Sequence, residues 1–387
     1  MPTIYQPPTR RQFMRFISML ASSAIAPAAL SACGGGSDAA AATPDPQQPV
    51  AIQPDWLLPD EGDRHLCSWM SFNVSADIWG SRMLTPVQDA LARIANAIIQ
   101  FEALKVIVSP ANLAAAKAKL DPRIQLVIAA SDDLWIRDTG CLTVRNRKGQ
   151  RRAISFNFNG WGNKQRHEQD ATVAATMSSN SQLPMLRSRL VLEGGGIEVD
   201  GQGTAIITES CVLNSNRNPG WSKAEAEAEL LATLGIRKVI WLPGIAGKDI
   251  TDGHTDFYAR FIRPGVVVAN LEQDTAHYDY ALTRRHLDIL RNATDVNNQR
   301  LQITTLSPPA QIRPEFSSKD FAAGYINFYL LNGAVLCPEF GDRSADEAAR
   351  SALAGLYPER KIVMLNIDPI AWGGGGIHCA TQHEIAS

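Results

Sequence analysis

Residues 372–382 read Trp-Gly-Gly-Gly-Gly-Ile-His-Cys-Ala-Thr-Gln, and this block is the most informative stretch of the chain. Four consecutive glycines let the backbone approach a ligand closely and adopt conformations that other residues avoid. Cys379 follows directly after this turn, which is where a nucleophile would be placed. Cys211 and Cys337 stand in apolar runs that are typical of buried structural thiols. The local sequence therefore favours catalysis for Cys379, and a structural role stays open.

Similar polar or glycine-rich turns occur at four earlier places, and each leads into a short strand pattern. Taking one residue from each turn, the successive spacings are 55, 61, 73 and 52 residues. This regularity predicts one supersecondary unit repeated five times around an axis, so that all five turns meet at one opening on that axis. The alternative is that these turns are ordinary loops between the elements of an α/β domain that has no repeat. The five marker residues are Asp138, Glu193, His254, Asn327 and Cys379.

The segments between the turns alternate between helical and strand patterns, which predicts an α/β fold. Apolar residues at helical spacing predict a helix at 86–102, and Ser222 predicts the start of another that ends before Gly235. A third helix is expected at 346–356. Short apolar runs predict strands at 105–108, 124–128, 238–241, 265–269 and 361–366.

Two polar blocks supply further candidate site residues. In Thr251-Asp-Gly-His-Thr-Asp256, His254 and Asp256 are two positions apart, so on a strand they would share one face. A metal site is disfavoured there, because the chain has no pair of histidines four residues apart and no third histidine nearby. In Trp135-Ile-Arg-Asp-Thr-Gly140, the tryptophan precedes Asp138 by three positions and would suit a planar cation.

The block Leu192-Glu-Gly-Gly-Gly-Ile-Glu-Val-Asp-Gly201 is rich in glycine, but no helix-forming segment follows it. A dinucleotide fingerprint needs that helix, so a nucleotide site is excluded. The charge is nearly balanced, with 37 basic and 39 acidic residues, and no basic stripe indicates nucleic-acid binding. The six cysteines contain no Cys-x-x-Cys pair, which disfavours a zinc ribbon or a thioredoxin-type site.

The first 54 residues predict an export signal followed by a flexible linker. Arg10 and Arg11 with the apolar residues after them are typical of a twin-arginine export signal, and Leu30-Ser-Ala-Cys33 resembles a lipoprotein cleavage box. We therefore expect residues 1–33 to be an export signal, with Cys33 lipidated in the periplasm. Residues 34–54 lack large apolar side chains and are expected to be a flexible linker. Residues 55–387 would form the catalytic domain.

Taken together, the motifs resemble the agmatine deiminase family, which is similar to the bacterial type of peptidyl-arginine deiminase. The resemblance runs from about residue 56 to residue 382, and it implies a five-fold pseudo-symmetric α/β propeller of the pentein type, built from repeated ββαβ units. Its motifs are Trp135-Ile-Arg-Asp-Thr-Gly, Asn159-Gly-Trp-Gly, Leu192-Glu-Gly-Gly-Gly-Ile-Glu-Val-Asp-Gly, Asn214-Ser-Asn-Arg-Asn-Pro, Thr251-Asp-Gly-His-Thr-Asp, Tyr325-Ile-Asn-Phe-Tyr and Gly374-Gly-Gly-Ile-His-Cys-Ala-Thr-Gln.

The resemblance implies that Cys379 is the nucleophile and His254 the general acid and base, while Asp138 and Asp256 hold a guanidinium group. Only a thiolate attacks such a delocalised cation efficiently, and paired carboxylates would fix its carbon near the sulfur. The product would be N-carbamoylputrescine with ammonia from agmatine, or citrulline from arginine residues. This chemistry requires no metal, redox or nucleotide cofactor, so none is expected.

Three further positions gain roles from the resemblance. Asn327 matches an active-site asparagine of the peptidyl-arginine deiminases, and Trp135 and Glu193 would lie in or near the substrate pocket. Ile250 departs from the family pattern, because agmatine deiminases usually carry an acid there that can meet the far amine of agmatine. The choice between agmatine, free arginine and arginyl peptides therefore stays open.

Two other functions remain as alternatives. One is a cysteine amidinotransferase or peptidase that uses the same types of side chain. The other is an exported, non-catalytic lipoprotein that binds a polyamine or an arginine-like ligand. The expected partners are a small guanidine or arginyl-peptide substrate and a membrane, reached through the lipid on Cys33. The sequence leaves the oligomeric state open, a homodimer included.

Overall fold

The computed structural model describes residues 55–387. The predicted signal at 1–33, with the lipidation site Cys33, and the predicted linker at 34–54 lie outside the described residues. The described part belongs to one compact unit, Ile52–Ser387. Among its helices, none has both the length and the apolar character needed to span a bilayer.

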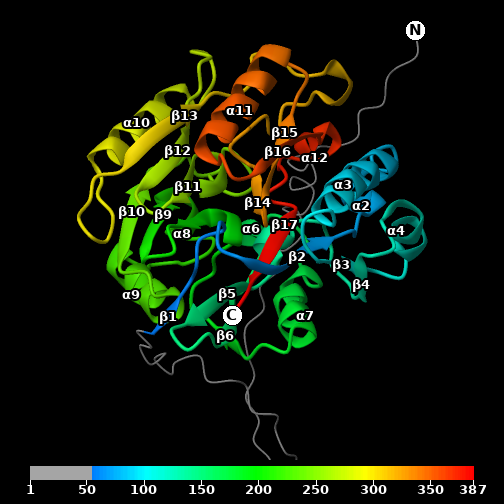
Figure 1. The fold of residues 1–387 in the computed structure, drawn as a ribbon, viewed down its shortest axis with the longest axis horizontal. Coiled ribbons are helices and arrows are strands. Elements are labelled where there is room, and N and C mark those ends of the chain that lie inside the picture. The colour runs from blue at the N-terminus through cyan, green and yellow to red at the C-terminus, as the bar shows by residue number, and fades with distance from the viewer. Residues whose placement is uncertain (1–54) are drawn as a thin grey trace, which may run out of the picture. The chain divides into compact units, whose positions relative to one another are not determined.

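Five small sheets follow one another along the chain, and all five repeat one local order of strands (Figure 1). The first strand pairs antiparallel with the second, and the second pairs parallel with the third. Two sheets carry a fourth strand, β1 in one and β4 in the other. The sheets are β1 (Trp56–Leu57), β5 (Leu142–Asn146), β6 (Arg151–Ser155) and β7 (Met185–Arg187); β8 (Ile197–Val199), β9 (Thr204–Thr208) and β10 (Lys238–Leu242); β11 (Ala259–Arg263), β12 (Val266–Asn270) and β13 (Gln302–Leu306); β14 (Tyr329–Leu331), β15 (Ala334–Glu339) and β16 (Lys361–Asn366); and β17 (Thr381–Ile385), β2 (His65–Ser71), β3 (Leu104–Val108) and β4 (Gln125–Ile128).

A helix connects the second and third strands of every sheet, as a parallel pairing requires a crossover. In Figure 1 these helices lie at the periphery of the unit, outside the sheets. They are α7 (Val173–Asn180), α9 (Lys223–Leu234), α10 (Tyr280–Asn292), α11 (Arg343–Leu356) and α3 (Leu84–Ile98). The remaining helical turns are α2 (Ala76–Trp79), α4 (Leu113–Lys119), α5 (Ile136–Thr139), α6 (Gly160–Asn163), α8 (Glu209–Val212), α12 (Asp368–Trp372), η1 (Asp170–Thr172), η2 (Gly194–Gly196), η3 (Thr255–Phe257) and η4 (Pro314–Phe316).

The predicted α/β class and the five-fold repeat are confirmed, and the boundaries of the predicted elements shift by a few residues. The helix that begins after Ser222 has a complete capping box with Glu225 and ends at Gly235, whose φ of 71° is left-handed. The helix predicted at 346–356 begins three residues earlier, because the side chain of Asp342 accepts from the amide of Ala345 and caps it. The helix predicted at 86–102 is α3 and ends at Ile98.

The fifth sheet joins the two ends of the described chain. Its first strand, β17, comes from the C-terminal end and pairs antiparallel with β2 from the N-terminal end, with Gln382 opposite Trp69. Strand β17 also contacts β5 of the neighbouring sheet. The last unit of the repeat therefore forms only when both ends of the fold have come together.

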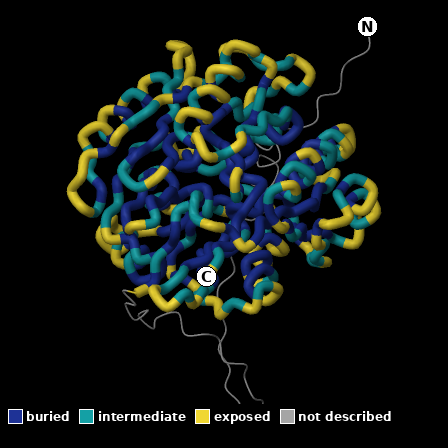
Figure 2. Tube along the Cα trace, in the orientation of Figure 1, coloured by how far each residue is buried: buried dark blue, intermediate teal, exposed yellow. Residues whose placement is uncertain are grey.

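Each marker residue lies in the turn that precedes the first strand of a sheet. Asp138 precedes β5, Glu193 precedes β8, His254 precedes β11, Asn327 precedes β14 and Cys379 precedes β17. The first strands are also the innermost, since β8, β14 and β17 are buried along their whole length, whereas the outer strands β4 and β7 have exposed residues at both ends (Figure 2). The turns therefore meet near the centre of the unit.

Ion pairs join the inner strands across the centre. Arg260 on β11 has no exposed surface, and its guanidinium donates to Glu198 on β8 at 2.9 Å and to Glu61 at 2.8 Å. It also donates to the carbonyl oxygen of Phe328 at 2.7 Å. Three different units are thus held to one buried cation.

Replacing Arg260 with methionine should destabilise the fold by about 3–5 kcal/mol, because two buried carboxylates would lose their shared cation. The free energy of unfolding in urea, measured at neutral pH, tests this. Arg350→Met is the matched control, since Arg350 lies on the surface and pairs only with the exposed Glu347. Equal stability of the two variants would contradict the role given to Arg260.

Candidate active site

The turn before β17 places the sulfur of Cys379 beside Asn327 and Asp256. The Asn327 side chain donates from Nδ2 to Sγ at 3.3 Å and accepts from the Cys379 amide at 3.3 Å. Asp256 Oδ2 lies 3.6 Å from Sγ. Gly376 makes this approach possible, because a Cβ atom there would lie 2.3 Å from Asn327 Oδ1. The glycine run therefore brings the turn against the neighbouring unit.

Three predicted residues face one small space on the other side of the site. A Cβ atom built on Gly195 would lie 2.7 Å from His254 Nδ1, 2.9 Å from Asp138 Oδ1 and 3.0 Å from Asp256 Oδ2. Glycine at this position keeps that space open for a ligand. All three side chains are buried, so charges placed there interact strongly.

Asp138 is held rigidly at the edge of this space. Its Oδ2 accepts from the indole N–H of Trp161 at 2.9 Å, and its Oδ1 accepts from the amide of Gly195 at 3.0 Å. Burial raises the pKa of Asp138, and the nearby carboxylates of Asp256 and Glu193 add to the rise. A bound cation would relieve this repulsion.

Asp256 has one oxygen engaged and one available. Its Oδ2 lies 2.8 Å from Nδ1 of His378, while its buried Oδ1 has no hydrogen-bond partner among the described residues. A buried carboxylate oxygen without a donor is costly unless a ligand supplies one. Burial works against the charge, but the contact with His378 lowers the pKa of Asp256. The unpaired oxygen is therefore a ready acceptor for an N–H group.

His254 stands between two acids. Its Nε2 lies 3.3 Å from Glu193 Oε2, and its Nδ1 lies 3.7 Å from Asp138 Oδ1. Burial opposes a charge on the ring, but Asp138 and Glu193 outweigh it and raise the pKa of His254 well above its usual value. Arg217 holds Glu193 from behind at 2.8 Å and, with His254, lowers the pKa of that carboxyl to about 2 although burial works against it. His254 is therefore an imidazolium that can donate a proton.

Burial, Asp256 and Asp138 raise the pKa of the Cys379 thiol well above its usual value, although the contact with Asn327 acts in the opposite direction. In the resting site, Cys379 is therefore a thiol. It becomes a thiolate only when a positive charge enters the space between the two aspartates.

A chain of charged groups supports Asp256 from the far side. His378 contacts Asp256 through Nδ1 at 2.8 Å and Glu61 through Nε2 at 2.9 Å. Burial and two neighbouring arginines lower the pKa of His378. However, a ring nitrogen without a proton would point its lone pair at a carboxylate oxygen. Because His378 contacts a carboxylate through each of its two nitrogens, both contacts are favourable only if the chain Glu61–His378–Asp256 carries two protons.

The structure brings together all seven site residues predicted within its described part. Trp135 packs its ring against Gly375, next to the nucleophile turn, and its ring centroid lies 6.0 Å from that of Trp79. The remaining predicted residues are linked by the contacts given above, and Cys33 lies outside the described residues. Sequence reasoning gave no role to the following supporting residues: Glu61, Trp161, Cys211, Arg217 and His378.

The sequence features that could have identified these supporting residues differ from one residue to the next. Trp161, Arg217 and His378 lie within motifs that the sequence analysis quoted, so their position could have marked them. Glu61 follows a plain Pro-Asp pair and carries no local signal. Cys211 stands in a run that is typical of structural thiols, yet its Sγ lies 3.5 Å from Glu193 Oε2. With His254, these two residues form the cluster that could hold a metal ion.

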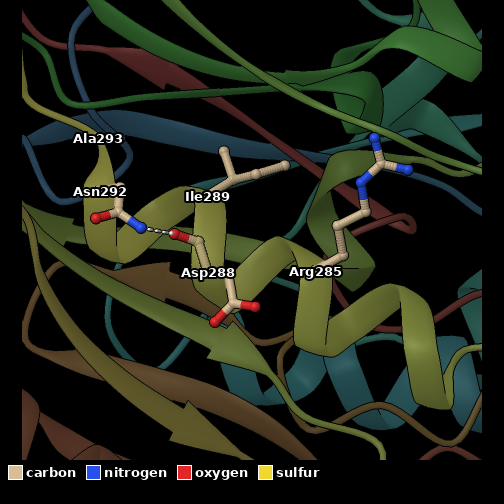
Figure 3. Close-up of a pocket in the computed structure, with 5 residues that line it drawn as sticks. All are labelled: Arg285, Asp288, Ile289, Asn292 and Ala293. Atoms are coloured by element: carbon tan, nitrogen blue, oxygen red, sulfur yellow. Dashed lines mark hydrogen bonds between the residues drawn. The ribbon is translucent and has the colours of Figure 1, made fainter.

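A surface hollow on α10 lies away from this cluster of residues. It is lined by Arg285, Asp288, Ile289, Asn292 and Ala293 (Figure 3). Its one internal contact is the donation from Asn292 Nδ2 to the backbone oxygen of Asp288 at 2.9 Å. It offers no thiol or imidazole, so the candidate active site is the buried cluster around Cys379.

Comparison with known proteins gives consistent results. The family model for Porphyromonas-type peptidyl-arginine deiminase matches residues 57–384. An agmatine deiminase of Stutzerimonas stutzeri is 35% identical over 86% of this chain and 96% of that protein, and one of Pseudomonas fluorescens (strain SBW25) is 34% identical over 85% and 95%. The solved structure of an agmatine deiminase of Enterococcus faecalis has a TM-score of 0.81 and 32% identity, and covers 86% of this chain and 96% of that one.

Replacing Glu193 with glutamine should lower the pKa of His254, because it removes a negative charge 3.3 Å from Nε2. Histidine NMR titration of the Cys379→Ala protein, with and without the second substitution, measures the shift. The exposed Glu347 offers a control substitution that should leave the titration of His254 where it is. An unchanged or higher pKa in the Glu193→Gln protein would show that this carboxylate does not hold the proton on His254.

Proposed function

Because the chain belongs to the Porphyromonas-type peptidyl-arginine deiminase family, we propose that it catalyses the hydrolytic deimination of a guanidino substrate. One observation carries the proposal. Asp138, His254 and Asp256 face a single space beside Gly195, and the Cys379 sulfur lies 3.6 Å from Asp256. Two acids, one imidazolium and one thiol are the groups that this reaction requires.

Substrate binding uses the two aspartates. A planar guanidinium donates N–H groups in a fixed fork, and carboxylates on both sides match that geometry. Oδ2 of Asp256 and Oδ1 of Asp138 face the space beside Gly195, and Oδ1 of Asp256 has no donor among the described residues. Trp161 and Gly195 hold Asp138 in this position. The cation offsets the repulsion between the two acids and sets its central carbon near the sulfur.

Entry of the cation activates the nucleophile. A positive charge next to Cys379 lowers the pKa of the thiol, so the thiol proton passes to solvent water as the substrate binds. The sulfur then adds to the guanidinium carbon, and His254 protonates the departing nitrogen. Ammonia leaves, and a covalent thiouronium remains on Cys379.

Hydrolysis completes the reaction. His254, now neutral, takes a proton from water, and the hydroxide adds to the thiouronium carbon. The carbon–sulfur bond breaks, the ureido product leaves and the thiol is restored. The hydroxyl proton of the intermediate passes to the departing sulfur as the new carbonyl group forms.

Agmatine is the substrate that we propose first, because the similar proteins of Stutzerimonas stutzeri and Pseudomonas fluorescens are agmatine deiminases. The departure at Ile250 bears on this choice, because no carboxylate stands there for the far amine. Its backbone oxygen accepts instead from Nζ of Lys164 at 3.0 Å. Free arginine and arginyl peptides are therefore the substrates to compare with agmatine.

The two alternatives receive less support. A peptidase acts on a neutral amide and has no need of two carboxylates around the reacting carbon. A binding protein has no need of a thiol and an imidazolium on the same space as the carboxylates. The family membership also favours the deiminase.

We also propose that the chain is exported by the twin-arginine route and anchored in the membrane by a lipid on Cys33. The arginine pair and the residues before Cys33 support this proposal. The five cysteines of the described part are free and buried, which suits an enzyme that folds before export.

Ammonia release from agmatine, arginine and arginyl peptides tests the function. Cys379→Ala should abolish release from every substrate, because the attacking sulfur is lost. Asp138→Asn and Asp256→Asn should each lower kcat/KM roughly 10²–10³-fold, since a charged contact to the cation is lost. Cys337→Ala is the control, because this buried thiol lies in the core between Tyr325 and Pro338 and should leave kcat/KM unchanged. Full activity of Cys379→Ala would disprove the proposal.

Fractionation of cells that express the full chain tests the export. The protein should appear in the membrane fraction, and Cys33→Ser should release it from that fraction. Arg10→Lys combined with Arg11→Lys should keep it in the cytoplasm. Membrane association that survives Cys33→Ser would exclude the lipid anchor.

A further inference from the structure

Glu193, Cys211 and His254 form a cluster of three potential metal ligands behind the reacting space. Their ligand atoms all lie within 4.8 Å of one another. Glu193 comes from the turn before β8, Cys211 from α8 and His254 from the turn before β11, so three rigid parts of the fold supply them. None of the three side chains is exposed by more than 2%. The cluster is therefore built into the fold.

The distances within the cluster match those of a tetrahedral zinc site. Zinc bonds of about 2.3 Å to sulfur and about 2.1 Å to nitrogen or oxygen give tetrahedral edges of about 3.6 Å between sulfur and oxygen and about 3.4 Å between nitrogen and oxygen. The observed separations from Glu193 Oε2 are 3.5 Å to Cys211 Sγ and 3.3 Å to His254 Nε2. Two of the three separations therefore match the edges of a tetrahedral site, and the third, between Cys211 and His254, is no more than 4.8 Å.

The charges of the cluster also fit a divalent cation. Burial raises the pKa of Cys211, and the pKa of His254 is raised by its acidic neighbours, so the resting cluster carries one proton on each. A divalent cation that displaces these two protons leaves the net charge of the cluster, ion included, unchanged. Arg217, which donates to Glu193 at 2.8 Å, would therefore meet no additional positive charge.

Gly196 leaves room beside the cluster. A Cβ atom built there would lie 3.2 Å from Leu192 Cδ1, 3.4 Å from Cys211 Sγ and 3.7 Å from His254 Cδ2, so a larger residue would crowd this side of the cluster. Three protein ligands and one water molecule would complete a four-coordinate site. Arg217 would act as the outer partner that orients Glu193.

We propose that Glu193, Cys211 and His254 bind a thiophilic divalent cation of the zinc class, and that the bound ion reversibly inhibits the enzyme. The ion occupies Nε2 of His254, so the ring is held as a neutral imidazole with its one proton on Nδ1. That N–H group is too weak an acid to protonate the leaving nitrogen, and the ring has no free lone pair to take a proton from water. The inhibitory effect rests on the deiminase function proposed above. The binding itself does not.

Metal binding is therefore measured directly, on the full chain with Cys379→Ala, so that the nucleophile cannot act as a ligand. Equilibrium dialysis with zinc alone should give one bound ion per chain. Cobalt in its place should give a thiolate-to-metal absorption band. Adding Cys211→Ala to this protein should remove the absorption band. It should also weaken zinc binding by more than roughly 10–100-fold, which is the loss expected when only a hydrogen-bond partner of a ligand is removed.

Cys337→Ala in the same background is the matched control and should retain both binding and the band. If Cys211→Ala does not fold, Glu193→Gln takes its place with the same expected loss. Zinc binding that disappears with Cys379→Ala alone, or that persists unchanged without Cys211, would overturn the proposed site. Tight binding without inhibition of the enzyme with Cys379 intact would overturn the regulatory role only.

Discussion

One buried carboxylate, that of Glu61, ties the repeat units to one another and to the reacting groups. It accepts from Arg137 at 2.7 Å, from Arg260 at 2.8 Å and from the amide of Leu330 at 2.9 Å. His378 contacts it at 2.9 Å. Burial works against its charge, yet Arg260, His378 and Arg137 hold its pKa well below the usual value. An ion this deep in the protein is tolerated only with such a complete set of partners.

The consequence for chemistry follows from geometry. The residues around Glu61 belong to the first strands, or to the turns just before them, that also carry the site, so the arrangement that satisfies this anion also aligns the turns. Through His378 the same network fixes one oxygen of Asp256 and leaves the other without a donor. The outcome is a space bordered by two acids, an imidazolium and a thiol whose pKa is raised by burial and by the two acids. Such a site selects a cationic substrate and withholds its nucleophile until that substrate arrives.

Much of this was predictable from local sequence, because the repeat places each chemical residue in a turn just before an inner strand. The spacing of the markers predicted the five units, and the glycine-rich turns predicted which residues would meet. Glu61 and Cys211 were not predicted as site residues, because burial beside a charged partner from another unit is a tertiary property. Their local sequences give no sign of it. The start of α11 was missed for a different reason, because the cap that Asp342 gives to this helix is a local contact that lies outside the apolar pattern.

The central claim is that Cys379 attacks a guanidinium carbon held between Asp138 and Asp256. Acid quenching of the enzyme during turnover of agmatine, followed by mass spectrometry of its peptides, tests this most directly. We expect a peptide in which Cys379 carries the substrate less one ammonia, and we expect this peptide to be absent from the Asp256→Asn protein. Turnover with no adduct on Cys379, or with an adduct on a different residue, would contradict it.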